Sequence, residues 1–290
     1  DLPNLKHYAK LKIGKSQSIV VGYTEGTRGC KHICRHCPIV PIYHGRFFVV
    51  QPKVVMADIR QQVEAGAKHI TFGDPDFFNG PGHAIRLIES FHVEFPNLTY
   101  DATIKVEHLL KNTHYLETLT RTGCLFVTTA VESVNDRILT ILDKGHTRND
   151  FIRLVGLTRD ANLTLSPTFI PFLPWTTPKG YLDLLRLLAV LELVDYVAPV
   201  QLSIRLLVPE GSRLLVIPEM QQHLGHLDAD HGWYPQTGSL WGEHGGSGCA
   251  LADRGVGAHS ERVLGYASHG PVEKTKQNWC TRSHGAVASS

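Results

Sequence analysis

The chain has 290 residues, of which 42% are hydrophobic and 19% are charged, with a net charge of +2 when the histidines are neutral. This composition is that of a folded globular protein, and so small a charge gives no reason to expect nucleic acid or an anionic membrane as the main partner. No segment approaches the ~20 consecutive apolar residues that a membrane-spanning helix needs. The densest apolar run, 182–194, is interrupted by Asp183, Arg186 and Glu192.

The amino terminus carries no cleavable signal pattern, so we expect a cytoplasmic protein that does not associate with membranes. The chain begins at Asp1 rather than Met, which is compatible with a leading segment that the sequence does not include.

Short apolar runs alternate with longer amphipathic ones from residue 18 to about 208, a pattern that predicts parallel strands separated by covering helices. The predicted strands are 18–23, 69–72, 98–103, 125–130, 164–170 and 196–202. These make about six βα units, so the expected fold class is α/β, a partial (β/α)6-type barrel.

Helix starts and ends are also readable in the sequence. The recurrence of Val55, Ile59 and Val63 every four positions predicts a helix over 54–65, which Gly66 ends. Thr147 with an aspartate three positions later predicts a capping box. A Thr-Pro pair at 177–178 predicts another helix start.

The periodicity ends near Pro218, after which Gly, His and Ser become dense. We therefore expect a lead-in segment over 1–17, a core domain over 18–215, and an irregular or disordered C-terminal tail over 216–290.

The segment TRGCKHICRHCP places Cys30, Cys34 and Cys37 in C-x-x-x-C-x-x-C spacing directly after the first predicted strand. Thiolates are the usual ligands of iron–sulfur clusters, and a 4Fe-4S cube normally takes four, so three ligands would leave one iron open. Two other interpretations stand beside this one: a zinc site completed by His32, His36 or a distant cysteine, and a chance grouping.

This spacing, its place after the first strand and the βα repeats resemble the radical SAM superfamily over residues 18–210. The resemblance implies a 4Fe-4S cluster on the three cysteines and S-adenosylmethionine on its fourth iron. It also implies reductive cleavage of S-adenosylmethionine to a 5′-deoxyadenosyl radical, an electron donor such as a flavodoxin or ferredoxin, and a substrate that the sequence does not identify. His36 departs from the family, which usually has an aromatic residue there.

Further residues match the family's cofactor-contacting positions. In TFGDPDF, Gly73 and Asp74 occupy the place of a Gly-Gly-Glu-type motif that contacts the methionyl amine, although the same residues with Pro75 also suit a turn that ends a strand. In YDATIKVEHL, Thr103 and Lys105 are expected on one side of a strand, next to substrate or cofactor; a solvated lysine is the alternative.

The segment TTAVESVNDRILTILDKGHTRND resembles a stretch shared by radical SAM proteins of the methylthiotransferase and elongator type. It places Glu132 and Ser133 at the carboxyl end of a strand, where barrel active sites lie, and implies contact with the ribose or methionyl part of the cofactor. A helix amino-terminal cap is the alternative. The resemblance assigns no catalytic residue beyond the cluster ligands.

Three cysteines lie outside the loop. Cys124 is expected to be a buried, small apolar residue, whereas Cys249 and Cys280 leave open a second cluster in the tail. The segments HCPIVP and GDPDF resemble those of a bacterial radical SAM subgroup with cysteine- or selenocysteine-bearing tails. Two other functions remain: aminocarboxypropyl or methyl transfer with the same cofactors, and noncatalytic zinc binding.

Overall fold

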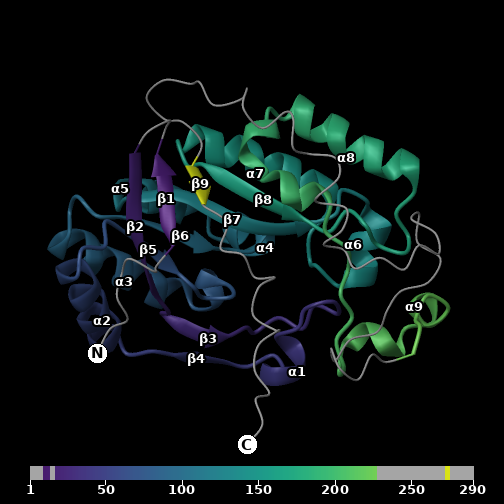
Figure 1. Ribbon diagram of the computed structural model, residues 1–290, viewed down its shortest axis with the longest axis horizontal. Helices are drawn as coiled ribbons and strands as arrows, with labels where there is room; N and C mark the ends of the chain where they lie inside the picture. Colours follow the sequence, from purple (N-terminus) through teal and green to yellow (C-terminus); the bar gives the residue numbers. More distant parts are fainter. Residues whose placement is uncertain (1–8, 14–16, 227–271, 275–290) are drawn as a thin grey trace, which may run out of the picture.

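The computed structural model describes residues 9–13, 17–226 and 272–274 (Figure 1). The strands are β1 (Lys10–Ile13), β2 (Gln17–Thr24), β3 (Thr27–Gly29), β4 (Phe47–Val49), β5 (His69–Phe72), β6 (Thr99–Thr103), β7 (Cys124–Glu132), β8 (Leu165–Phe169) and β9 (Val272–Lys274). The helices are α1 (Val40–Tyr43), α2 (Pro52–Glu64), α3 (Pro81–Glu94), α4 (Val106–Lys111), α5 (Leu116–Arg121), α6 (Asp136–Leu142), α7 (Arg148–Asp160), α8 (Pro178–Val190) and α9 (Pro218–Gln221). Among these described residues, no helix is both long enough and apolar enough to cross a membrane.

Within the described part of the chain, seven strands form one sheet in the order β8-β7-β6-β5-β2-β1-β9. The neighbours from β2 to β8 are parallel, whereas β1 pairs antiparallel with both β2 and β9. Helices connect the parallel strands, as expected for parallel pairing, which requires a long crossover. The predicted class, a partial β/α barrel, is confirmed (Figure 1).

The predicted strands 18–23, 69–72, 98–103, 125–130 and 164–170 correspond to β2, β5, β6, β7 and β8. The helix predicted over 54–65 is α2. The capping box at Thr147 and the helix start at Thr177 are both present, since each threonine side chain accepts a backbone N–H of the first helical turn. Local signals therefore located most of the barrel.

The sixth predicted strand, 196–202, is wrong. The chain there forms two short 3-10 helices, Val194–Tyr196 and Pro199–Leu202, and a parallel pairing appears only later as an isolated bridge between Phe172 and Arg205. The physical reason is Pro199, which has no N–H to donate and is disfavoured within a strand.

The main core lies between the parallel sheet and its covering helices. Phe72 on β5, Phe91 on α3 and Tyr100 on β6 are fully buried and contact one another edge to face. Edge-to-face pairs add about 0.5–1.5 kcal/mol beyond the burial of their area. This rigid layer fixes the positions of β5 and β6, whose carboxyl ends lead into the candidate site.

The β3–β4 hairpin, which the sequence did not predict, lies with α1 beyond the carboxyl end of β2 (Figure 1). The chain between its two strands contains Cys30, Cys34 and Cys37. The cysteine loop, residues 30–39, is thus closed at its base by a short antiparallel ladder.

The predicted tail is described only in part. Its beginning contains α9, where Met220 is fully buried against the cluster that also includes Leu173 and Leu214. The segments 227–271 and 275–290, with Cys249 and Cys280, lie outside the described residues. The domain boundaries at residues 17 and 215 stay predictions.

Candidate active site

Gly29 starts the cysteine loop in a conformation that needs glycine. Its φ is +81°, and a Cβ there would lie 2.5 Å from the backbone oxygen of Arg46. The buried Asn79 holds the same point of the loop, because its amide group donates to the Gly29 oxygen (3.0 Å) and accepts from the Lys31 N–H (3.1 Å). The first ligand position is therefore fixed from both sides.

The three cysteines are free thiols: Cys34 is buried, while Cys30 and Cys37 are partly buried. Burial, with smaller contributions from Asp76, Cys34 and Cys37, raises the pKa of Cys30 to about 11, although a backbone hydrogen bond at His32 partly offsets the rise. Burial also raises the pKa of Cys37. Thiols of this kind release their protons when they bind metal.

The loop is tied to distant parts of the chain. The Arg35 N–H donates to the Leu142 oxygen and its guanidinium to the Ile141 oxygen, both at 2.9 Å, at the end of α6. The Ser212 hydroxyl donates to the Arg35 oxygen at 3.0 Å, and the Arg213 guanidinium donates to a second loop carbonyl. The loop is therefore held in place by segments more than 100 residues away.

Lys105 reaches the loop from the end of β6. Its buried side chain places Nζ 3.8 Å from Cys34 Sγ and 3.4 Å from Glu107 Oε2. Lys105 lies at the N-cap of α4 and not within the strand, since β6 ends at Thr103. An ammonium group at this distance would attract the negative charge of a metal-binding sulfur.

Glu132, at the end of β7, is buried and accepts from His36 Nε2 (3.2 Å) and Lys144 Nζ (3.3 Å). Burial alone would raise the pKa of Glu132, but the charge of Lys144 and the hydrogen bond from His36 outweigh it and lower that pKa to about 2. His36, the residue that departs from the family pattern, therefore joins the cysteine loop to β7. The sequence did not reveal Lys144, although it lies in the segment TTAVESVNDRILTILDKGHTRND.

The backbone at Glu132 is strained. Its φ is +68°, and the pairing register of β7 with β8 shifts between Ala130 and Glu132. A non-glycine residue in this region costs of order 1–3 kcal/mol, and such residues concentrate at functional sites.

Asp74 has both carboxylate oxygens engaged: Oδ2 accepts from the Gly26 N–H (2.8 Å) and Oδ1 from the Thr27 hydroxyl (2.6 Å). Burial raises the pKa of Asp74 to about 6, partly offset by these hydrogen bonds. The carboxylate thus fixes the turn between β2 and β3. Its neighbour Gly73 lies under the Tyr23 ring, where a Cβ would come within 1.9 Å of the Tyr23 hydroxyl.

The remaining predicted residues occupy strand ends. Thr103 is the last residue of β6 and is partly buried. Ser133 follows β7, and its hydroxyl accepts from the Asn135 N–H at 3.2 Å. The cap of α6 is Asn135 itself, so the helix-cap alternative for Ser133 is wrong. The roles of Gly73, Asp74, Thr103, Lys105, Glu132 and Ser133 toward a cofactor stay predictions.

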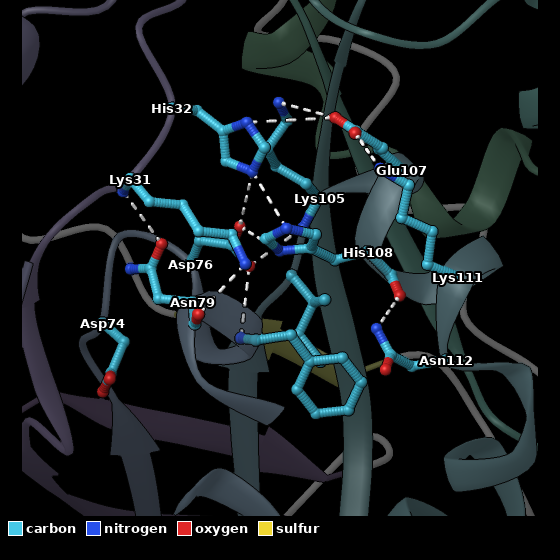
Figure 2. A network of polar contacts seen from close by, with 12 residues as sticks. Lys31, His32, Asp74, Asp76, Asn79, Lys105, Glu107, His108, Lys111 and Asn112 are labelled. Atoms are coloured by element: carbon cyan, nitrogen blue, oxygen red, sulfur yellow. Dashed lines mark hydrogen bonds and ion pairs between the residues drawn. The ribbon is translucent and has the colours of Figure 1, made fainter. Parts of the chain in front are cut away.

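A second polar network borders the loop (Figure 2). Within the described residues, the only three His, Cys, Asp or Glu side chains whose ligand atoms all lie within 4.8 Å of one another are His32, Asp76 and His108. Burial, together with Lys105 and His108, lowers the pKa of His32 to about 4, so its ring is neutral at pH 7. Sequence reasoning passed over Asp76 and His108, because no spacing rule links residues so far apart.

Comparison with known proteins places this site in a family. The sequence model of the radical SAM superfamily matches residues 24–188, more than half of the chain. The chain belongs to the radical SAM superfamily. Radical SAM proteins are enzymes whose cofactors are a 4Fe-4S cluster and S-adenosylmethionine, and the three loop cysteines are a donor set that fits such a cluster.

Among curated radical SAM relatives, the tRNA-2-methylthio-N(6)-dimethylallyladenosine synthase of Flavobacterium psychrophilum is 25% identical over 186 residues, which are 56% of this chain and 38% of the relative. The chain thus spans less than half of that relative's length.

Solved radical SAM structures share the fold. OxsB, with aqua-cobalamin and S-adenosylmethionine bound, gives a TM-score of 0.57 at 15% identity over 74% of this chain and 38% of its own. The methyltransferase TsrM from Kitasatospora setae, with cobalamin and a [4Fe-4S] cluster bound, gives 0.53 at 18% identity over 60% of this chain and 33% of its own. At these identities the likeness is one of fold alone.

Proposed function

We propose that this chain binds one 4Fe-4S cluster through Cys30, Cys34 and Cys37 and cleaves S-adenosylmethionine reductively to act on a substrate by hydrogen abstraction. When bound together, the two cofactors supply a one-electron cleavage that yields methionine and a 5′-deoxyadenosyl radical. The electron comes from a small donor protein such as a flavodoxin or ferredoxin. The observation that carries the proposal is the set of three free thiols on one anchored loop beyond the carboxyl end of β2.

Lys105 and Glu132 have different roles beside the cysteine loop. Lys105, 3.8 Å from Cys34 Sγ, offsets the negative charge that three thiolates bring into a buried loop. Glu132 stays ionised at neutral pH, so it can orient His36 of the loop and can accept hydrogen bonds from a ribose or an ammonium group.

The other predicted cofactor contacts have separate roles. At Gly73 the Tyr23 ring fills the place of a side chain, so a contact there would use the backbone, whereas Thr103 and Ser133 offer hydroxyls at strand ends. Asp74 acts by fixing the turn before the cysteine loop, because its two oxygens are already engaged by Gly26 and Thr27.

A noncatalytic zinc site is the contrasting function. Sulfur ligands of one tetrahedral zinc ion lie about 3.8 Å apart, given a Zn–S distance of about 2.3 Å. The three loop sulfur atoms do not all lie within 4.8 Å of one another, whereas ligand atoms of His32, Asp76 and His108 do. This spacing favours a larger inorganic centre at the cysteines.

The test compares Cys34→Ala with Cys124→Ala under anaerobic reconstitution. Cys124 is a buried free thiol on β7, away from the loop, and so serves as a matched control. We expect wild type and Cys124→Ala to bind about four irons per chain, to be brown and to release 5′-deoxyadenosine with dithionite. Cys34→Ala should lose all three properties. Unchanged 5′-deoxyadenosine from Cys34→Ala would overturn the proposal.

Analysis of the spent cofactor distinguishes the transfer reactions. Methylthioadenosine in place of 5′-deoxyadenosine would indicate aminocarboxypropyl transfer, and S-adenosylhomocysteine would indicate methyl transfer. A colourless protein with zinc and no iron would instead support the binding function.

A further inference from the structure

The group formed by His32, Asp76 and His108 joins three separate elements (Figure 2). His32 belongs to the cysteine loop, Asp76 precedes the short 3-10 helix Phe77–Asn79, and His108 lies in α4. His32 Nε2 lies 2.9 Å from His108 Nε2 and 3.9 Å from Asp76 Oδ2, and His108 Nδ1 lies 2.6 Å from Asp76 Oδ2. His108 thus presents Nε2 to His32 and Nδ1 to Asp76, and one ligand atom from each of the three residues lies within 4.8 Å of the other two.

Hydrogen bonding within the protein does not satisfy this group. Asp76 Oδ2 and His108 Nδ1 are buried, and despite their 2.6 Å separation they are not aligned as a hydrogen bond and have no other partner. Leaving a buried polar atom unsatisfied costs about 1–3 kcal/mol. A cation bound to both atoms would remove this cost at each of them.

Neighbouring backbone groups position the Asp76 carboxylate in the way that outer-sphere groups position a metal ligand. Asp76 Oδ1 accepts from the backbone N–H groups of Phe78 (3.2 Å) and Lys105 (3.4 Å), which leaves Oδ2 directed toward the histidines. The far ring nitrogen of His32, Nδ1, lies 3.9 Å from Glu107 Oε2. This contact is longer than a hydrogen bond, so Glu107 lies behind His32 without fixing the orientation of its ring.

We propose that His32, Asp76 and His108 form a mononuclear site for a divalent transition-metal ion such as Zn²⁺ or Fe²⁺. Two histidines and one carboxylate are a ligand set of both ions, and with three protein ligands the ion keeps positions open for water or substrate. His32, whose side chain is 19% exposed, marks the side from which an ion enters. This site goes beyond the proposed function and does not depend on the cluster.

The competing account is a proton-conducting chain that runs from Asp76 through His108 to His32 without any metal. The 2.9 Å contact between the two Nε2 atoms suits that chain, but the misaligned contact between Asp76 and His108 does not. The metal site is favoured because the two atoms that a cation would bind, Asp76 Oδ2 and His108 Nδ1, are the buried atoms that hydrogen bonding leaves unsatisfied.

The test uses the full chain with the three loop cysteines replaced by serine, so that no thiolate of the loop and no cluster can bind the probe. Co²⁺ is titrated under anaerobic conditions, and its visible absorption and binding stoichiometry are measured. We expect one high-affinity Co²⁺ per chain, with no sulfur-to-metal charge-transfer band. Zn²⁺ should displace it.

Variants in the same background identify the ligands. Asp76→Asn, which keeps the shape of the side chain, and His32→Ala should each weaken Co²⁺ binding at least ten-fold. His114→Ala removes a nearby exposed histidine and should leave binding unchanged. Circular dichroism checks that each variant is folded, and a folded Asp76→Asn variant suffices if His32→Ala is not.

Two outcomes would overturn the metal site: no stoichiometric Co²⁺ binding, or equal affinity in the folded Asp76→Asn variant and its parent. In either case the proton chain becomes the account of the three residues. Because the loop cysteines are absent from every chain in this titration, the result is independent of whether the iron–sulfur proposal holds.

Discussion

Replacing Glu132 by Gln should destabilise the fold strongly, because it leaves Lys144 buried without a counter-charge. The pKa of Glu132 falls from an ordinary 4.5 to about 2 in the folded chain, the net result of burial, which raises it, and of Lys144 and His36, which lower it. At 1.36 kcal/mol per pKa unit, this shift corresponds to about 3 kcal/mol of stability at pH 7. Removing one partner of a buried ion pair typically costs about 3–5 kcal/mol, which agrees.

The sign of the pH dependence follows from the lowered pKa. The contribution of Glu132 is fully present above pH 4.5 and is lost as the pH falls through its folded-state value of about 2. The difference in unfolding free energy between wild type and Glu132→Gln should therefore be constant from about pH 7 to about pH 5 and shrink below that.

The assay is urea unfolding of the cluster-free full chain under reducing conditions, followed by circular dichroism at several pH values. Glu89→Gln is the matched control, since Glu89 makes an exposed pair with Arg121 at 3.7 Å and should change stability by less than ~1 kcal/mol. The reasoning is refuted if Glu132→Gln costs no more than this control at pH 7, or if its cost grows on acidification.

Two further predictions concern the loop. Gly29→Ala should lower stability and iron content more than Gly66→Ala does. Both glycines have a positive φ, but only at Gly29 would the new Cβ meet a backbone oxygen, at 2.5 Å. Equal iron contents in the two variants would contradict this prediction. Lys105→Met should lower the reduction potential of the bound cluster, because a positive charge 3.8 Å from Cys34 Sγ favours the reduced, more negative state. The control is Lys111→Met, which removes an exposed lysine and should leave the potential unchanged in an EPR-monitored redox titration. An unchanged potential in Lys105→Met would count against the placement of Lys105 beside the cluster.

The elements that could be predicted from the sequence are those fixed by local patterns. Apolar runs located β5, and the threonine capping box located the start of α7. The β3–β4 hairpin was missed because its strands are three residues long, too short for a period-2 pattern. The false strand at 196–202 shows how one proline overrides an apolar run.

The candidate site was predictable as a set of residues but not as a set of contacts. Its cysteines and Glu132 lie in readable motifs. The hydrogen bond between His36 and Glu132, however, joins positions 96 apart, and that between Thr27 and Asp74 joins positions 47 apart. Such pairings depend on the order in which β2, β5, β6 and β7 pair in the sheet, which no local pattern encodes.

The long-range ties of the cysteine loop determine when a metal centre could be built. Arg35 is bonded to Leu142 and to Ser212, 107 and 177 positions further along the chain. During synthesis the three thiols are therefore exposed well before the partners that hold their loop have emerged. A nascent chain released before residue 212 would therefore lack part of the frame that holds the cysteine loop.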